Sequence, residues 1–412
     1  MKPLTVCHLG KYYPPAPGGI ETHVRTLAQA QAALGTRVEV LCINHEPGPT
    51  AVEEDGPVKV TRLGRLGSAM KLDFCPQVVN ALRRVKADVL HMQVPNPTMI
   101  LALLAARPRP PLVVTYQSDV VVQKLRAAVF RPLERLLYRR VRVILPSSPT
   151  YPGGSAFLRP YADRIRVLPM GIDLKPYIEP SEADRARAAQ VREAHGRGGP
   201  FWLCAGRLVY YKGFVNALRA LTRVKGRLVL IGNGPDEPLL RAEAGRLGVA
   251  DRVDFLGALP YLEIVPYYLA ADAFWFPSNA RSEAFGLVQV EAMASGCPVI
   301  NTAIPHSGVS WVSQHEESGL TVPVNDVSAL AAAAWRLLEE PGLRDRLVAG
   351  GRRRSVAEFD HRVMAERSLE YYRMVLEGEA ARACSPAACT EAEGAADPGQ
   401  TRTALPSAEA GL

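Results

Sequence analysis

Residues 4–19 read LTVCHLGKYYPPAPGG, and this stretch decides the fold that the sequence predicts. Leu4 to Leu9 is an apolar run typical of a buried parallel strand, and the Pro- and Gly-rich segment after it is typical of a loop. Apolar residues at helical spacing then predict a helix over residues 20–34, which ends at Gly35. A second apolar run, Arg37 to Ile43, completes a strand–loop–helix–strand unit. Such a unit opens a doubly wound parallel sheet.

The same alternation continues along most of the chain and predicts an α/β fold. In the first series, strands are expected near residues 58–63, 88–92, 112–116 and 141–145, with helices near 77–85, 98–106 and 120–140. In the second series, strands are expected at 201–205, 227–231, 253–256, 273–276 and 298–301, with helices near 214–224, 237–247, 261–270, 284–295 and 327–339. Strands and helices in this order form parallel sheets covered on both faces.

The length favours two domains, because 412 residues exceed what one hydrophobic core usually serves. We predict two Rossmann-like domains that face a cleft, an N-terminal domain at residues 1–168 and a C-terminal domain at residues 169–354. Residues 355–377 are expected to form a closing helix that returns toward the N-terminal domain. Residues 378–412 have almost no large apolar side chain, which predicts a disordered tail.

Charge and cysteine content limit the classes of partner and of compartment. A net charge of +8 and a pI near 9.2 indicate an anionic partner, such as a nucleotide or a lipid phosphate. No nucleic-acid-binding motif occurs, so nucleic acid is not an expected partner. Seven scattered cysteines without a C-x-x-C pair indicate reduced thiols in a cytoplasmic protein. The longest apolar run, Met99 to Ala106, is too short to span a bilayer.

Two carboxylates in the second domain, Glu283 and Glu291, stand eight residues apart. Glu283 falls in a loop after the strand at 273–276, and Glu291 is expected about two turns into the following helix. The helix start between them offers free N–H groups and a partial positive charge, which suit a phosphate. Carboxylates on either side could hold a phosphorylated sugar at both ends. A capping acid and a surface acid would give the same pattern.

The loop after the first strand of the second domain carries two cations. It runs from Gly206 to Gly213 and contains Arg207 and Lys212. Doubly wound sheets bind ligands at the carboxyl ends of their strands, and a diphosphate needs cations that offset its charge. The spacing of a P-loop is absent. A solvated loop with surface cations is the alternative interpretation.

Two glycine turns have the same ambiguous status, Gly18-Gly19 in the first loop and the turn at residues 232–235. Each could approach a phosphate or a sugar, or could simply form a turn. The G-x-G-x-x-G pattern is absent, which argues against a nicotinamide or flavin cofactor. No Asp-x-Asp occurs, so no metal site and no cofactor are predicted.

Two further stretches of the first domain are candidates. Asp119, after a first-domain strand, could orient a hydroxyl or accept a proton, or could cap a helix. Residues Lys124 to Arg142 contain seven Lys or Arg, one acid and interleaved apolar residues. This pattern is typical of a basic amphipathic helix on an anionic membrane face, and equally of a surface helix that packs its apolar stripe on the sheet.

Taken in order, these motifs resemble the retaining glycosyltransferases of family 4, which have the GT-B fold. The resemblance covers roughly Leu4 to Val375. Its most specific parts are Glu283 and Glu291 with Phe285-Gly286 between them, and Arg207 with Lys212. Several such motifs in one order are far more specific than any one of them.

The resemblance implies a donor site for a nucleotide-diphospho-sugar, either a GDP- or a UDP-sugar. Glu283 would hold hydroxyls of the donor hexose, Arg207 and Lys212 would bind the diphosphate, and Glu291 would take the ribose hydroxyls. Further donor contacts are implied for Gly19, Gly234, Leu259, Phe285, Gly286 and Leu287. Such enzymes retain the anomeric configuration without a metal.

We predict Glu283, Asp119 and Gln117 as the catalytic residues. Family members often have a His where this chain has Gln117. A Gln can hydrogen-bond a sugar hydroxyl but cannot carry a charge, so an acid–base role at this position is open.

The stretches around Gln117 and Glu283 resemble those of bacterial mannosyltransferases of exopolysaccharide and O-antigen assembly. Those enzymes act at the cytoplasmic membrane face on polyprenyl-diphosphate-linked acceptors. The resemblance implies transfer of a hexose, with GDP-mannose as first choice of donor, to a glycan or lipid-linked acceptor by a protein that is cytoplasmic or peripheral on the inner membrane face. An epimerase of nucleotide sugars and a catalytically silent scaffold of the same fold are the alternatives.

Overall fold

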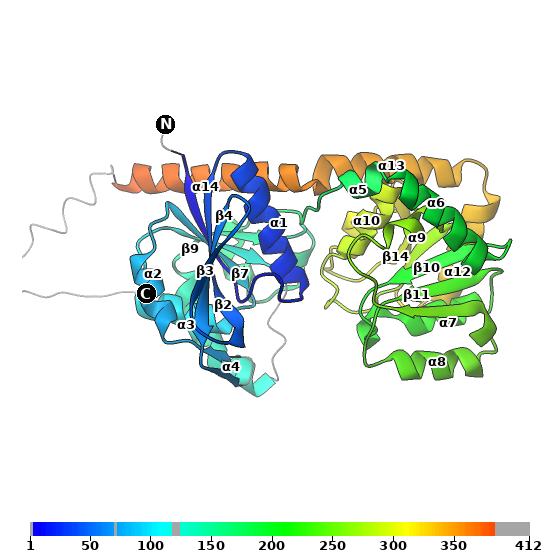
Figure 1. Cartoon of the computed structure of the whole chain (residues 1–412), viewed down its shortest axis with the longest axis horizontal. Helices are drawn as coiled ribbons and strands as arrows, with labels where there is room; N and C mark the ends of the chain where they lie inside the picture. Colours follow the sequence, from blue (N-terminus) through cyan, green and yellow to red (C-terminus); the bar gives the residue numbers. More distant parts are fainter. Residues whose placement is uncertain (1–2, 70–71, 118–123, 384–412) are drawn as a thin grey trace, which may run out of the picture.

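The computed structural model describes residues 3–69, 72–117 and 124–383, and it contains two α/β bodies side by side (Figure 1). A seven-stranded sheet in the order β3-β4-β2-β1-β7-β8-β9 forms the first body. Its strands are β1 (Thr5–Leu9), β2 (Arg37–Pro47), β3 (Ala51–Asp55), β4 (Val58–Arg65), β7 (Val89–Val94), β8 (Leu112–Tyr116) and β9 (Val141–Pro146). All neighbours are parallel except β3 and β4.

A six-stranded, fully parallel sheet in the order β12-β11-β10-β13-β14-β15 forms the second body. Its strands are β10 (Phe201–Ala205), β11 (Arg227–Ile231), β12 (Val253–Gly257), β13 (Ala273–Phe276), β14 (Val299–Thr302) and β15 (Gly319–Val322). The predicted doubly wound fold is therefore confirmed for both halves of the chain.

Helices cover these sheets, because the apolar stripe of each helix is buried against the apolar strands. On the first sheet they are α1 (Gly19–Ala33), α2 (Gln77–Arg84), α3 (Pro97–Ala106) and α4 (Lys124–Tyr138). On the second they include α7 (Phe214–Leu221), α8 (Glu237–Arg246), α9 (Val265–Ala270), α10 (Leu287–Ser295) and α12 (Val327–Glu339). Short helices α5 (Lys175–Ile178), α6 (Glu182–Val191) and α11 (Val309–Val312) complete the second body.

Each sheet reverses its strand order at one point. In the first sheet the reversal lies between β1 and β7. The strands β2, β4 and β3 extend the sheet on the β1 side, and β8 and β9 extend it on the β7 side. In the second sheet the same reversal lies between β10 and β13. Loops at such a reversal diverge, which leaves space for a ligand outside the carboxyl ends of the strands.

The structure differs from the sequence prediction at several element boundaries. The antiparallel edge strand β3, the small hairpin of β5 (Gly67–Ala69) and β6 (Leu72–Phe74), and the edge strand β15 were not predicted, because they are short or mostly polar. Helix α9 begins at Val265 instead of Tyr261. Helix α10 begins at Leu287 instead of Ala284, because Gly286 takes a φ of +81° that does not continue a helix.

Two long helices, α13 (Leu343–Phe359) and α14 (His361–Ala383), run end to end along one side of both bodies (Figure 1). The junction of the two helices lies beside Ile172, where the chain first passes from one body to the other. The amide of Ile172 donates to the carbonyl of Phe359, and the amide of His361 donates to the carbonyl of Ile172 (both 3.0 Å). The domain boundaries at residues 168, 354 and 377 stay predictions.

Helix α14 docks on the first sheet through an apolar face that includes Met364, Leu369 and Val375. A buried polar network continues this contact: Gln31 on α1 donates to Ser368 and Tyr372, and Tyr372 hydrogen-bonds His91 at 2.6 Å. Burial lowers the pKa of the neighbouring His8 to about 4, so this network is uncharged at neutral pH. The last helix is therefore part of the N-terminal body.

The beginning of the predicted tail is helical, which corrects that prediction. Helix α14 continues past Gly378 to Ala383, because the segment is rich in Ala, Glu and Arg, which favour helix. The rest of the predicted tail, residues 384–412, lies outside the described residues.

Candidate active site

An ion pair between two mostly buried side chains lies at the reversal point of the second sheet. Lys212 Nζ is 2.5 Å from Glu283 Oε2, and the side chains are 12% and 11% exposed. Lys212 follows β10 and Glu283 follows β13, so each comes from one of the two strands that flank the reversal. The same ammonium group lies 5.0 Å from the centre of the Phe276 ring, and Ser278 Oγ approaches Glu283 Oε2 at 3.4 Å.

Glycines allow the loops of this edge to pack closely. A Cβ on Gly213 would lie 2.0 Å from the carbonyl oxygen of Pro277, and one on Gly234 would lie 2.1 Å from that of Leu208. Next to them, Leu208 donates to the carbonyl of Asn233, and Asn233 Oδ1 accepts from the amide of Ala258. The Gly232–Pro235 turn therefore contacts both the cation loop and the loop that carries Leu259.

The two predicted diphosphate cations have different surroundings. Lys212 is neutralised by Glu283, whereas Arg207 is exposed and has no ion pair among the residues that the structure describes. An anion that enters the site could therefore bind Arg207 first. The anion would then compete with Glu283 for the ammonium group of Lys212.

The segment that joins the two carboxylates is held by aromatic packing. Phe285 is buried, and its ring lies 5.6 Å from the ring of Phe359 and 6.4 Å from that of Trp311. Gly286 lies so close to Phe276 that a Cβ would be 2.7 Å from its ring. Leu287 then begins α10, so the free amides of this helix start follow directly after Glu283.

Glu291 lies nearer the start of α10 than predicted. Because the helix begins at Leu287, Glu291 is its fifth residue, little more than one turn in, and the expected two turns are wrong. Tyr268 on α9 donates to Glu291 Oε2 at 2.9 Å. Burial among protein atoms raises the pKa of Glu291 to about 7, although the Tyr268 hydrogen bond acts in the opposite direction.

Two further tyrosines, Tyr177 and Tyr261, are close enough to Glu291 for its charge to raise their pKa values after the larger effect of burial. Sequence reasoning did not identify Tyr177, Tyr261 or Tyr268. The signal in the sequence was weak, because single tyrosines near a helix start are common in any core.

The raised pKa of Glu291, combined with its predicted contact to the donor ribose, predicts a pH-dependent donor affinity. Donor hydroxyls donate to an ionised carboxylate, so only the form present above the pKa is competent, and donor affinity should rise roughly tenfold between about pH 6 and pH 8. The measurement is the Kd of a nucleotide-sugar by calorimetry across this range. Glu291→Gln should give weaker binding and a flat profile. An equally flat wild-type profile would contradict the assignment.

The N-terminal candidates lie at the corresponding edge of the first sheet. Gly19 is the exposed first residue of α1, and the carboxylate of Glu21 lies beside the preceding Gly18. Gln117 follows β8 and donates from Nε2 to Gln93 Oε1 at 3.3 Å. Asp119 lies outside the described residues.

The structure therefore brings one group of predicted residues together and leaves another apart. Residues of the C-terminal body share one edge of its sheet: Arg207, Lys212, Gly234, Leu259, Glu283, Phe285, Gly286, Leu287 and Glu291. In the described part of the chain, no hydrogen bond or ion pair joins Gly19 or Gln117 to this group. No cluster of His, Cys, Asp or Glu suited to a metal occurs in the described ranges either.

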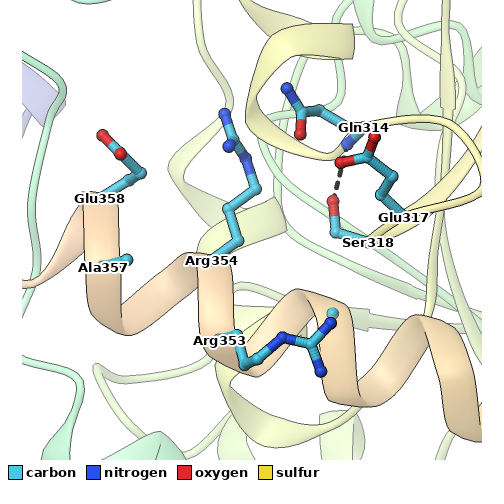
Figure 2. A pocket seen from close by; sticks show the side chains of 8 residues that line it. Gln314, Glu317, Ser318, Arg353, Arg354, Ala357 and Glu358 are labelled. Carbon is cyan, nitrogen blue, oxygen red and sulfur yellow. Dashed lines mark hydrogen bonds between the residues drawn. The ribbon is translucent and has the colours of Figure 1, made fainter.

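A separate hollow of about 270 Å³ lies between α13 and the loop at residues 314–318 (Figure 2). Of its charged residues, Arg354 donates to the carbonyls of Trp311 and Val312 and lies 5.0 Å from the centre of the Trp311 ring. Trp311 in turn packs against Phe285, which precedes α10. Arg354 on α13 therefore contacts the start of α10 indirectly, through Trp311 and Phe285.

Both bodies of the chain match family models of known proteins. Residues 187–354 match the family model described as glycosyl transferases group 1, and residues 18–171 match the glycosyl transferase 4-like domain. The chain is 32% identical to O-antigen chain mannosyltransferase C of Escherichia coli, over 91% of this chain and 100% of that protein. It is also 32% identical to the D-rhamnosyltransferase WbpZ of Pseudomonas aeruginosa, over 82% of this chain and 87% of that protein.

Solved structures show the same fold at lower identity. Sucrose-phosphate synthase of Thermosynechococcus elongatus superimposes with a TM-score of 0.72 at 24% identity, over 91% of this chain and 100% of that chain. HepE of Anabaena, solved in complex with UDP, superimposes with a TM-score of 0.70 at 20% identity, over 90% and 100%.

The matched ranges cover both bodies and the loops that carry Arg207, Lys212, Glu283 and Glu291. No helix among the described residues is long and apolar enough to cross a membrane. The chain belongs to the group 1 glycosyltransferases, has the GT-B fold, and is a glycosyltransferase of polysaccharide or glycolipid biosynthesis.

Proposed function

We propose that the chain transfers mannose, with retention of configuration, from GDP-mannose to a glycan or polyprenyl-diphosphate-linked acceptor of a cell-surface polysaccharide. The observation that carries this proposal is the Lys212–Glu283 pair of 2.5 Å at the reversal point of the second sheet. The pair places a cation suited to a diphosphate next to a carboxylate that can hydrogen-bond the hydroxyls of the sugar. The choice of mannose is supported by the 32% identity to an O-antigen mannosyltransferase over 91% of the chain.

In the proposed reaction, the bond between the sugar and the diphosphate breaks and a bond to the acceptor oxygen forms. The acceptor's proton passes to the departing phosphate oxygen, so the products are the glycoside and the nucleoside diphosphate. Arg207 and Lys212 offset the charge that develops on the diphosphate, and Glu283 stabilises the positive charge that develops on the sugar. Glu291 receives the ribose hydroxyls.

The donor panel that tests this proposal contains GDP-mannose, GDP-D-rhamnose and UDP-glucose. GDP-D-rhamnose is included because of the identity to a D-rhamnosyltransferase, and UDP-glucose because HepE binds it. Each donor is offered with and without a polyprenyl-diphosphate-linked acceptor, and the anomeric proton of the product is read by NMR. Consumption of the donor without acceptor would indicate an epimerase, and binding without turnover would indicate a scaffold.

Docking on an anionic membrane face through residues 124–142 is part of the same proposal. At the end of α4, Leu137 and Tyr138 are buried in the core, whereas Arg135, Leu136 and the following Arg139 are exposed. Part of the apolar stripe, Leu137 and Tyr138, therefore packs on the sheet, and another part, Leu136, remains on the surface. The exposed cations remain suited to lipid phosphates.

We expect the protein to co-sediment with anionic vesicles at low salt and to be released at high salt, because attraction between exposed charges is screened within ~10 Å at 0.1 M. The double variant Arg135→Glu with Arg139→Glu should bind such vesicles less. Arg246→Glu on α8, which also reverses an exposed charge, is the control and should not. Equal sedimentation with neutral and anionic vesicles at every salt concentration would reject this docking face.

A further inference from the structure

Three segments from different parts of the chain meet where the two bodies touch. Residues 148–154 follow β9 of the N-terminal body, and the C-terminal body contributes residues 280–284 and 306–308. Arg281 Nη2 donates to the carbonyl of Tyr151 at 3.0 Å, and its guanidinium lies 4.1 Å from the centre of the Tyr151 ring. Thr150 Oγ1 donates to the carbonyl of Ser307 at 2.8 Å. The contact thus joins the two bodies directly.

The same C-terminal segments hold the backbone around Glu283. Arg281 Nε donates to the carbonyl of His306 at 3.2 Å, Ser307 Oγ donates to the carbonyl of Glu283, and the amide of Gly308 donates to the carbonyl of Ala284 at 2.9 Å. Glu283 is therefore fixed on one side by its ion pair with Lys212. On the other side its backbone is fixed by a segment that touches the N-terminal body.

The contact is close-packed. A Cβ on Gly154 would lie 2.5 Å from His306 Cβ and 2.9 Å from Arg281 Nε, and a Cβ on Gly308 would lie 2.8 Å from Ser148 Oγ. A shift of the N-terminal body by a fraction of an ångström at this point must therefore displace the segment that carries Glu283. Interiors at this density transmit strain because there is no free volume to absorb it.

We propose that Arg281 is a positioning residue that couples the docking of the N-terminal body to the placement of Glu283. The inference rests on the proposed function, because it assigns Glu283 to the reacting sugar. Arg207 and Lys212 belong to another loop of the C-terminal body, and Lys212 is linked to this segment through its ion pair with Glu283. Since both cations lie on that other loop, loss of Arg281 should slow transfer without weakening the binding of the nucleoside diphosphate.

The test compares Arg281→Ala and Arg281→Lys with a matched control. Arg241→Ala removes an arginine on α8 that also lies over a ring, 4.3 Å from the centre of the Phe255 ring. In the described part of the chain its ion pair is with Glu237 of the same helix, not with the Glu283 loop. Arg281→Ala should lower kcat roughly ten- to hundredfold, because small misplacements of a reacting group cost this much. The Kd for GDP and UDP should stay within about twofold of wild type. Arg281→Lys, which keeps a cation at the ring, should recover part of kcat, and Arg241→Ala should match wild type.

A second measurement needs no substrate. Hydrogen exchange in the unliganded protein should become faster at the amides of residues 280–284 and at Gly308 in Arg281→Ala, and should be unchanged in Arg241→Ala. Circular dichroism verifies folding of each variant. Wild-type kcat in Arg281→Ala, or unchanged exchange at these amides, would overturn the inference. If wild-type protein turns over no donor, the proposed function fails, and the exchange data alone decide whether Arg281 holds the Glu283 loop.

Discussion

Glu283→Gln should lower kcat by ~100- to 1,000-fold and leave the donor KM nearly unchanged. The carboxylate lies 2.5 Å from Lys212 and is 8% exposed as a whole residue, so its field is little screened by water. Positive charge develops on the sugar as its bond to the diphosphate breaks. A group that stabilises this charge more strongly than the ground state acts on kcat rather than on KM.

The donor KM should be preserved because the substitution has opposing effects on binding. Gln keeps the size of the side chain and can still hydrogen-bond sugar hydroxyls. Removal of the negative charge also frees Lys212, which strengthens its attraction to the diphosphate. Interactions lost only in the transition state lower kcat and kcat/KM equally, which is the pattern expected here.

The control for this experiment is Glu316→Gln. Glu316 is an ion-paired carboxylate of the same body, 2.6 Å from Arg336 and 2.9 Å from Arg346, and within the described ranges no hydrogen bond or ion pair joins it to the site. It should lose little activity. If Glu283→Gln transferred sugar at the wild-type rate, Glu283 would have no catalytic role and would be a structural partner of Lys212.

The sequence alone predicted the fold well because both sheets are parallel and buried. Such strands appear as continuous apolar runs, and those at residues 112–116, 201–205 and 227–231 were placed without error. The edge strand β3 carries three acids in five residues and is exposed, so no apolar signal marks it. The start of α10 was misplaced because the φ of Gly286 is set by its contact with Phe276, which is distant in sequence.

The candidate site was predictable as a set of residues but not as a set of contacts. Spacing placed Arg207, Lys212 and Glu283 in loops at strand ends of one sheet, and Glu291 in the helix that follows Glu283. It could not show that Lys212 and Glu283 neutralise each other, since they are far apart in sequence and no periodic pattern relates them. Nor could it identify Tyr268 or Arg281, because each acts through a single contact across the fold.

Lys212→Ala should weaken donor binding at least tenfold and also destabilise the protein. The loss of donor affinity reflects a charge-assisted contact with the diphosphate worth ~1.5–3 kcal/mol. The loss of stability has a separate cause, because among the described residues the carboxylate of Glu283 would keep only the 3.4 Å contact with Ser278 Oγ. Removal of one partner from a buried ion pair typically costs about 3–5 kcal/mol, since the other charge is left uncompensated.

A comparison with two other variants separates these effects. Arg207→Ala should weaken donor binding by about tenfold but leave Tm unchanged, because Arg207 is exposed and unpaired among the described residues. The double variant Lys212→Ala with Glu283→Gln leaves no uncompensated charge, so its Tm should lie above that of Lys212→Ala alone. The measurements are the donor Kd by calorimetry and Tm by scanning calorimetry. Unchanged donor affinity in both single variants would remove the diphosphate role of this loop, and a double variant no more stable than Lys212→Ala would show that the ion pair contributes little to the fold.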